Sequence, residues 1–435
     1  MINAIHIKNF KSYADATLPL APLTFLIGAN DSGKSNALEA IQIMSRLGAG
    51  DTLNSFMNAI SLGLAIRGNT FNWFGNATKP MTLGVNLSGD YISKYEFNVV
   101  FDRQRGLKFI GEQVYHYNYN SGSLAVDIVT EGQNGVLAHI YEDEDRRITV
   151  GSDNYNSLFM PDLALVSGSR LPSEPIETRE ELDFNSDELV QAFTDFVFAN
   201  PSAKAVREGV FNPVKDIGYD GRNTQTVLFN LLNDEQKGIE NKEVVLRFVD
   251  SFPEQQITDI QFLEGANNDV TVQLEESFGD AKRLVKMGLL SDGTVLALSY
   301  IAMVLAAEPG GTVVLEDIDE GIHPGRMKAM LEQLYELAKA RDLKLLFTSH
   351  NPAMLNALPR EAVLDTVFCY REPDTGNSQL VRLGDIQHYP ELIAQGGIGD
   401  LLAQGLIDNY VKNPATTEER MQQLEDWLKE INGDG

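Results

Sequence analysis

The sequence predicts an α/β protein with a mixed central sheet, an inserted antiparallel β lobe and a small helical insert. Three observations support this fold class. In residues 23–44 and again in residues 312–337, a short apolar run typical of a strand is followed by apolar residues at helical spacing. Residues 81–150 change to a two-residue period, which is typical of antiparallel strands. Helical spacing then returns in residues 187–250, without the long heptad run of an extended coiled coil.

The first elements are three short strands within residues 2–27, and the last of them, residues 23–27, is an apolar run. The stretch Gly28–Ser35 follows and reads G-x-x-x-x-G-K-S, and residues 36–44 after it have helical composition and spacing. A strand, a glycine loop and a helix in this order predict a phosphate-binding loop. The alternative is a chance glycine turn between a strand and a helix.

The residues of this loop suit a nucleoside triphosphate. Gly28, Asn30 and Gly33 belong to a turn whose successive N–H groups, together with the helix N-terminus, would face the phosphates. Lys34 would neutralise the β- and γ-phosphates, and the Ser35 hydroxyl would ligate magnesium. The sequence therefore predicts ATP and Mg²⁺ as cofactors.

Further expectations concern Lys11, in the turn before the loop, and the helices and strands of the rest of the chain. Lys11 is either a cation close to the phosphate loop or a solvated turn lysine. Helices are expected at residues 53–66, 188–198, 224–232 and 241–252, and strands at residues 257–263, 269–274, 363–370 and 379–383. Residues 416–431 read as a capped amphipathic helix that either docks on its own domain or meets a partner.

A capped helix is expected in the second half of the chain. Ser291 is a natural N-cap for the apolar residues 295–307, so the helix N-terminus and the Gly293 amide would present an anion site. By itself this pattern is only a capped helix.

Two buried strands also end in polar side chains. Residues 312–315 end in the adjacent carboxylates Glu316 and Asp317, which suit hydrated magnesium and an attacking water. Residues 343–348 end before the pair Ser349-His350. A lone strand-end histidine is often structural, but its place behind a phosphate loop favours a functional role.

Composition limits the partners and the compartment. The net charge is −27, from 62 acidic and 35 basic residues, which disfavours DNA and favours a protein partner with a basic face. The single cysteine, Cys369, excludes an internal disulfide and fits a reducing cytoplasm. The longest apolar run, residues 295–307, falls short of the roughly 20 residues of a membrane span. We expect a cytoplasmic protein without a membrane partner.

Taken together, these motifs resemble the SMC/RecF-like branch of the ATP-binding-cassette ATPases, in a compact AAA-family form that lacks a long coiled coil. The matching stretches are residues 10–12, 28–35, 290–294, 313–324 and 348–352, with weaker similarity at 220–223 and 399–402. The resemblance implies an ATP-binding-cassette head in which two copies enclose ATP. Ser291 and Gly293 would then act on the γ-phosphate held by the partner, and His350 would contact the γ-phosphate as a switch.

The order of the two carboxylates departs from the family pattern. The family usually has Asp and then Glu at this strand end, whereas this chain has Glu316 and then Asp317. The resemblance gives Glu316 the magnesium-side role and Asp317 the water-polarising role, with a side chain one methylene shorter. Because an attacking water must lie within hydrogen-bond reach of its base, hydrolysis is expected to be slow.

The resemblance also implies a division of the chain and a class of function. Residues 1–160 would form the first ATPase lobe, 161–285 a connector and helical insert, 286–383 the second lobe, and 384–435 a helical segment. The implied function is a homodimeric or larger switch that senses a trigger and controls an effector, a nuclease or toxin, in anti-phage defence. The alternatives are a RecF-like DNA repair ATPase that closes on DNA, and an ATP-bound scaffold that does not hydrolyse ATP.

Overall fold

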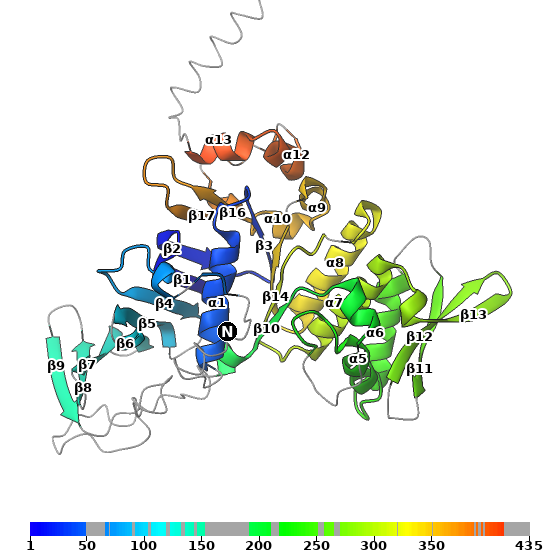
Figure 1. The fold of residues 1–435 in the computed structure, drawn as a ribbon, viewed down its shortest axis with the longest axis horizontal. Coiled ribbons are helices and arrows are strands. Elements are labelled where there is room, and N and C mark those ends of the chain that lie inside the picture. The colour runs from blue at the N-terminus through cyan, green and yellow to red at the C-terminus, as the bar shows by residue number, and fades with distance from the viewer. Residues whose placement is uncertain are drawn as a thin grey trace, which may run out of the picture.

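The structure is a computed structural model, and two large sheets and one small sheet organise it (Figure 1). It describes the chain from residue 1 to residue 412, apart from residues 49–65, 69, 89–91, 103–105, 119–121, 132–134, 143–145, 153–190, 210–216, 251–255, 265–269, 320, 350, 387–388, 390–392 and 395. Strands and helices are mixed throughout, which confirms the expected α/β class.

The first sheet has eight antiparallel strands. In order across the sheet they are β2 (Tyr13–Pro19), β1 (Ile2–Phe10), β4 (Met81–Leu87), β5 (Ile92–Asp102), β6 (Gly106–Asn118), β7 (Gly122–Glu131), β8 (Gly135–Glu142) and β9 (Arg146–Ser152). The strand period expected over residues 81–150 is therefore confirmed. Because β4 pairs with β1, these strands continue the sheet that the first two strands begin.

The central sheet has six strands. In order they are β10 (Phe196–Ala199), β14 (Thr312–Leu315), β15 (Lys344–Thr348), β3 (Leu23–Ile27), β16 (Val367–Arg371) and β17 (Ser378–Arg382). All neighbours are parallel except β16 and β17. The carboxyl ends of the five parallel strands therefore meet at one edge of the sheet, where ligands bind in open α/β sheets.

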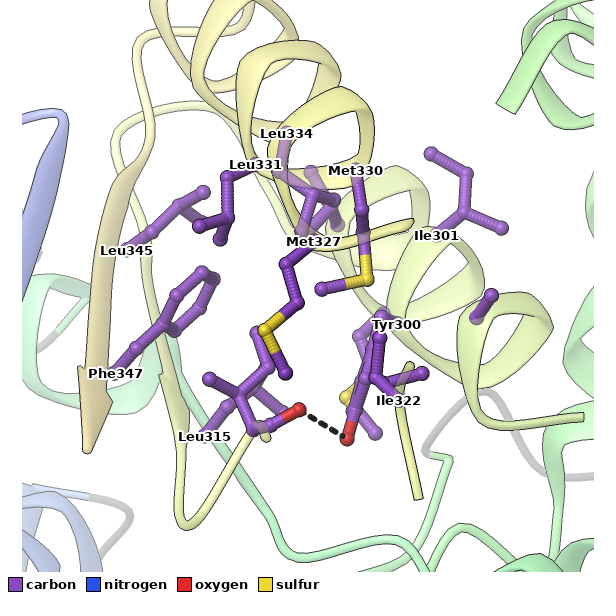
Figure 2. Packing of buried hydrophobic residues seen from close by; sticks show 14 of the residues in the cluster. Tyr300, Ile301, Leu315, Ile322, Met327, Met330, Leu331, Leu334, Leu345 and Phe347 are labelled. Atoms are coloured by element: carbon purple, nitrogen blue, oxygen red, sulfur yellow. Dashed lines mark hydrogen bonds between the residues drawn. The ribbon is translucent and has the colours of Figure 1, made fainter. Parts of the chain in front are cut away.

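The central sheet separates two hydrophobic cores, because successive side chains of a strand point to opposite faces. One face packs against α1 (Lys34–Gly48) and the antiparallel sheet. The other face packs against α7 (Asp292–Ala306) and α8 (Pro324–Ala340). Figure 2 shows this second core, in which Met327, Met330 and Leu331 of α8 lie over Leu345 and Phe347 of β15.

Helix α7 is surrounded by protein, and its residues from Gly293 to Leu305 are all buried. Its neighbours are α4 (Ala203–Arg207), α5 (Thr224–Leu232), α6 (Gly238–Asp250) and α8. The apolar run in the sequence is thus a core helix. Within the described part of the chain, no helix combines the length and apolar character needed to cross a membrane.

The remaining elements flank the central sheet. A small antiparallel sheet of β11 (Ile257–Glu264), β12 (Val270–Phe278) and β13 (Ala281–Lys286) lies beside α5 and α6 (Figure 1). Beyond β15 the chain forms α9 (Pro352–Asn356) and α10 (Arg360–Val363), and after β17 it forms α12 (Ile398–Ala403) and α13 (Leu406–Lys412). Short 3₁₀ turns lie at η1 (Thr70–Trp73), η2 (Met287–Leu289) and η3 (Leu383–Asp385).

Several expected boundaries differ from the structure. The helix expected over residues 188–198 is wrong at its end, because residues 196–198 belong to β10, whose parallel pairing with β14 overrides their local helical spacing. The strand expected from residue 363 begins at Val367, after the turn of α10. The helix expected at 53–66 falls on undescribed residues apart from Ile66, which is not helical, and the helix at 416–431 lies outside the described residues.

Candidate functional site

The glycine loop lies between the buried strand β3 and α1, as the sequence predicts. Gly28 and Gly33 have φ values of 146° and 124°, which a residue with a side chain rarely adopts. A Cβ atom on Gly28 would overlap the Cys369 carbonyl, and one on Gly33 would overlap the Ser378 hydroxyl. Both glycines are therefore required by the close approach of β16 and β17, in addition to any approach of phosphate.

Side chains from distant parts of the chain hold the loop in this conformation. Arg371 Nε donates to the Asp31 carbonyl at 2.9 Å, and the Ser378 hydroxyl donates to the Ser32 carbonyl. The Tyr13 hydroxyl donates to the Gly33 carbonyl at 3.1 Å. The C-terminal hairpin is thus a structural support for the loop, which the local sequence pattern did not indicate.

Lys34 lies across the loop rather than in solvent. Its Nζ donates to the carbonyls of Gly28 and Ala29 at 2.7 and 2.9 Å. Burial lowers the pKa of Lys34, and the nearby negative charges of Asp317 and Asp31 act against that shift. The electrostatic interaction with Asp317 links the loop to the carboxylates at the end of β14.

The other expected loop residues are placed at its rim. Asn30 is exposed, and Ser35 is half-buried in the first turn of α1. Lys11, in contrast, forms an ion pair with the buried carboxylate of Glu39 on α1, which Arg67 also contacts at 2.8 Å. Lys11 is therefore not a solvated turn lysine, and its observed partner is a carboxylate.

The two adjacent carboxylates follow β14 and are both half-buried. Glu316 Oε2 accepts a hydrogen bond from the Tyr219 hydroxyl at 2.6 Å. Asp317 has φ 47°, and its amide donates to Thr348 Oγ1 at 3.0 Å. Thr348 ends β15, so the neighbouring strand fixes the backbone that directs Asp317. His350, the expected switch residue, lies outside the described residues.

The expected anion site at α7 has the predicted cap. Ser291 is exposed, and its hydroxyl accepts from the Thr294 amide at 3.3 Å, which confirms the N-cap. Gly293 is buried, and a Cβ there would lie 3.1 Å from the Gly321 carbonyl and 3.4 Å from an Arg326 nitrogen. The neighbours of this turn are thus in the loop before α8 and in the first turn of α8.

Arg207, at the end of α4, holds the same turn. Its guanidinium donates to the Leu290 carbonyl at 2.7 Å and forms an ion pair with Asp292. Together with Tyr219, it belongs to the segment between β10 and α5, in which residues 220–223 show weak similarity to the resembled family. Neither residue was predicted, because each contacts a partner more than eighty positions away in the sequence.

The donor set determines what the site can hold. Among the described residues, no cluster of three or more His, Cys, Asp or Glu side chains could hold a metal ion. Magnesium characteristically uses one or two carboxylates together with substrate phosphates, and the oxygens of Ser35, Glu316 and Asp317 fit that use. The glycine loop, Lys34 and the strand-end carboxylates define the protein as a P-loop nucleoside triphosphatase.

The family model for the AAA ATPase domain matches residues 1–278, and the chain belongs to this family. The match confirms the AAA-family ATPase class expected from the sequence, and the protein is an ATPase. The matched range includes the glycine loop and Tyr219 and ends before the carboxylates at 316–317.

Two curated relatives have distant similarity. The chain is 20% identical over 374 residues to an OLD nuclease of Thermus scotoductus, with 83% of the chain and 61% of the relative covered. It is 21% identical over 386 residues to an ATP/GTP phosphatase of Helicobacter pylori, with 86% of the chain and 93% of the relative covered. The chain thus spans less than two thirds of the nuclease and nearly all of the phosphatase.

Solved SMC head domains are similar to the chain at low identity. The head domain from Thermotoga maritima has a TM-score of 0.37 at 14% identity, and the match covers 88% of the chain and 98% of that domain. An SMC head bound to the C-terminal winged-helix domain of ScpA has a TM-score of 0.44 at 13% identity, with 87% and 97% covered.

Proposed function

We propose that this ATPase is a dimerising switch, in which two copies enclose Mg-ATP, hydrolyse it slowly and control a separate effector protein. The observation that carries the proposal is that the site residues lie in two separate groups. Lys34 and Asp317 follow the carboxyl ends of β3 and β14 at one edge of the central sheet, whereas Ser291 is exposed at the start of α7. An exposed helix N-terminus with a polar cap is suited to a phosphate that another copy supplies.

In this proposal the loop binds the triphosphate. The N–H groups around Gly28, Asn30 and Gly33 contact phosphate oxygens. The Lys34 Nζ contacts two loop carbonyls in the structure. When the nucleotide binds, it pairs with oxygens of the β- and γ-phosphates instead. Lys34 is largely buried and so lacks full solvation, and a polyanion would be a strong partner for its charge.

Magnesium would be held by the Ser35 hydroxyl and Glu316, and its chemistry there is to neutralise charge on the phosphates. Asp317 would polarise the attacking water, and His350 would contact the γ-phosphate. Ser291 and Gly293 would complete the site of the partner copy.

A protein effector is favoured over DNA. The net charge of −27 opposes a phosphate backbone, although the alternative of a RecF-like clamp on DNA stays open to test. The distant relative named OLD nuclease supports a nuclease or toxin as the effector, and a role in anti-phage defence. The short Asp317 side chain also favours a second candidate, an ATP-bound scaffold that does not hydrolyse ATP.

The proposal is tested by light scattering and ATPase assays on the purified chain. Mg-ATP should convert monomers to dimers or larger assemblies, and Asp317→Asn should retain that form for longer. The wild type should turn over slowly; association without any turnover would favour the scaffold instead. An unchanged mass with Mg-ATP, in wild type and in Asp317→Asn, would contradict the dimerising switch.

A further inference from the structure

The Tyr219 side chain makes a short contact with Glu316, one of the two carboxylates that follow β14. Its hydroxyl donates to Glu316 Oε2 at 2.6 Å, and the other oxygen, Oε1, accepts no hydrogen bond from a described residue. A tyrosine hydroxyl is protonated at neutral pH and can donate this hydrogen bond. The tyrosine is 41% exposed, which means that packing alone does not account for its position.

The backbone around Tyr219 is built to hold it at the end of β14. Gly218 and Gly221, at φ 74° and 78°, form a turn that a 3.0 Å hydrogen bond closes. The amide of Asn200 donates to the Tyr219 carbonyl at 2.7 Å, and the Glu316 amide donates to the Ala199 carbonyl at 3.2 Å. The tyrosine and the glutamate are thus both fixed to the end of β10.

The need for such a restraint follows from the identity of residue 316. Glutamate has one more rotatable bond than an aspartate such as the neighbouring Asp317. Ordering a long side chain costs conformational entropy. A hydrogen-bond donor that holds one carboxylate oxygen before the metal binds reduces the conformational entropy that is lost when it binds.

We propose that Tyr219 is a positioning residue for magnesium, whose hydroxyl holds Glu316 Oε2 and leaves Oε1 for the metal or a water on it. The proposal rests on the proposed metal role of Glu316 and extends it to a residue outside every motif of the site. Tyr219 touches neither nucleotide nor metal in this account. It acts through Glu316 alone.

The test measures metal binding rather than turnover. Manganese binding is followed by electron paramagnetic resonance, with the full chain and a non-hydrolysable ATP analogue. Tyr219→Phe removes only the hydroxyl, and we expect manganese affinity to fall about tenfold, the equivalent of about 1.4 kcal/mol. Affinity for the nucleotide without metal should not change.

Tyr300→Phe is the matched control. The Tyr300 hydroxyl also lies near the end of β14, but it donates to a backbone carbonyl, that of Ile318, at 3.4 Å (Figure 2). This variant should lose thermal stability and keep its manganese affinity. An equal loss of manganese affinity in both variants would show that Tyr219 acts through general stability, and would overturn the proposal.

The same substitution in a Glu316→Asp protein tests whether Tyr219 acts through Glu316 or contacts the metal directly. Glu316→Asp shortens the carboxylate beyond the reach of the Tyr219 hydroxyl, so adding Tyr219→Phe to it should change manganese affinity less than twofold. A tenfold loss in that background too, or no loss in the Glu316 background, would refute the positioning role. If the wild type with nucleotide binds no manganese at all, the proposed metal site itself fails, and the inference fails with it.

Discussion

Loss of the Arg207 contacts should separate ATP binding from ATP-induced association. In the structure the Arg207 guanidinium donates to the Leu290 carbonyl at 2.7 Å and pairs with Asp292, one residue on each side of Ser291. Arg207→Ala removes both contacts but leaves the glycine loop unchanged. The turn that we assign to the partner's nucleotide then loses its side-chain support.

The magnitude follows from the two contacts. A hydrogen bond from a charged donor contributes about 1.5–3 kcal/mol, and an ion pair to an exposed carboxylate adds about 0–1 kcal/mol. We take about 2 kcal/mol for each turn, which is a factor of about 30. A symmetric dimer uses two such turns, so its association constant should fall about 1,000-fold.

The assay is light scattering over a range of protein concentrations with Mg-ATP, together with calorimetry of nucleotide binding to the monomer. The matched control is Arg222→Ala, because Arg222 lies in the same segment but makes an exposed ion pair with Asp220. The control should associate like the wild type. Unchanged association of Arg207→Ala, or an equally large loss of monomer nucleotide affinity, would refute the assignment of this turn to the partner.

Four further variants test other parts of the account. Lys34→Ala should lower nucleotide affinity in calorimetry at least tenfold, about 1.4 kcal/mol, because no other cation of the loop can replace it, and unchanged affinity would remove the phosphate-loop assignment. In steady-state ATPase assays Asp317→Asn should bind ATP but lose turnover, and Asp317→Glu should turn over faster if the short side chain is limiting. Full turnover in Asp317→Asn would contradict the assignment of the base. Glu39→Gln should reduce the free energy of unfolding in urea by about 2 kcal/mol, because it leaves the half-buried Lys11 ammonium without its charged partner; a loss under about 0.5 kcal/mol would mean that water solvates Lys11 after all.

Local sequence patterns predicted the elements that lie together in the chain. The loop from Gly28 to Ser35, the N-cap Ser291 and the strand end at Glu316 are each defined by a few consecutive residues and their apolar neighbours. The two-residue period likewise predicted the antiparallel strands over 81–150. In each case the residues that form the pattern and the element that they predict lie within the same short stretch of the chain.

The supports of the site could not be predicted in this way, because they depend on distant contacts. Arg371 and Ser378 lie more than 300 positions from the loop carbonyls that they hold. Tyr219 lies 97 positions from Glu316 and has no motif of its own. Strand β10 was missed for the same reason: four successive apolar residues read equally well as a helix end until β14 pairs with them.

A mixing experiment tests the central claim, that two copies share each ATP, most directly. Ser291→Arg blocks the turn offered to a partner, and Lys34→Ala disables the loop, so each variant alone should hydrolyse no ATP. A mixed dimer holds one intact loop opposite one intact Ser291 turn, and we predict that combining the two inactive proteins restores ATPase activity. Mixtures that stay inactive at every ratio, although mixed dimers are detected, would contradict a site shared between two copies.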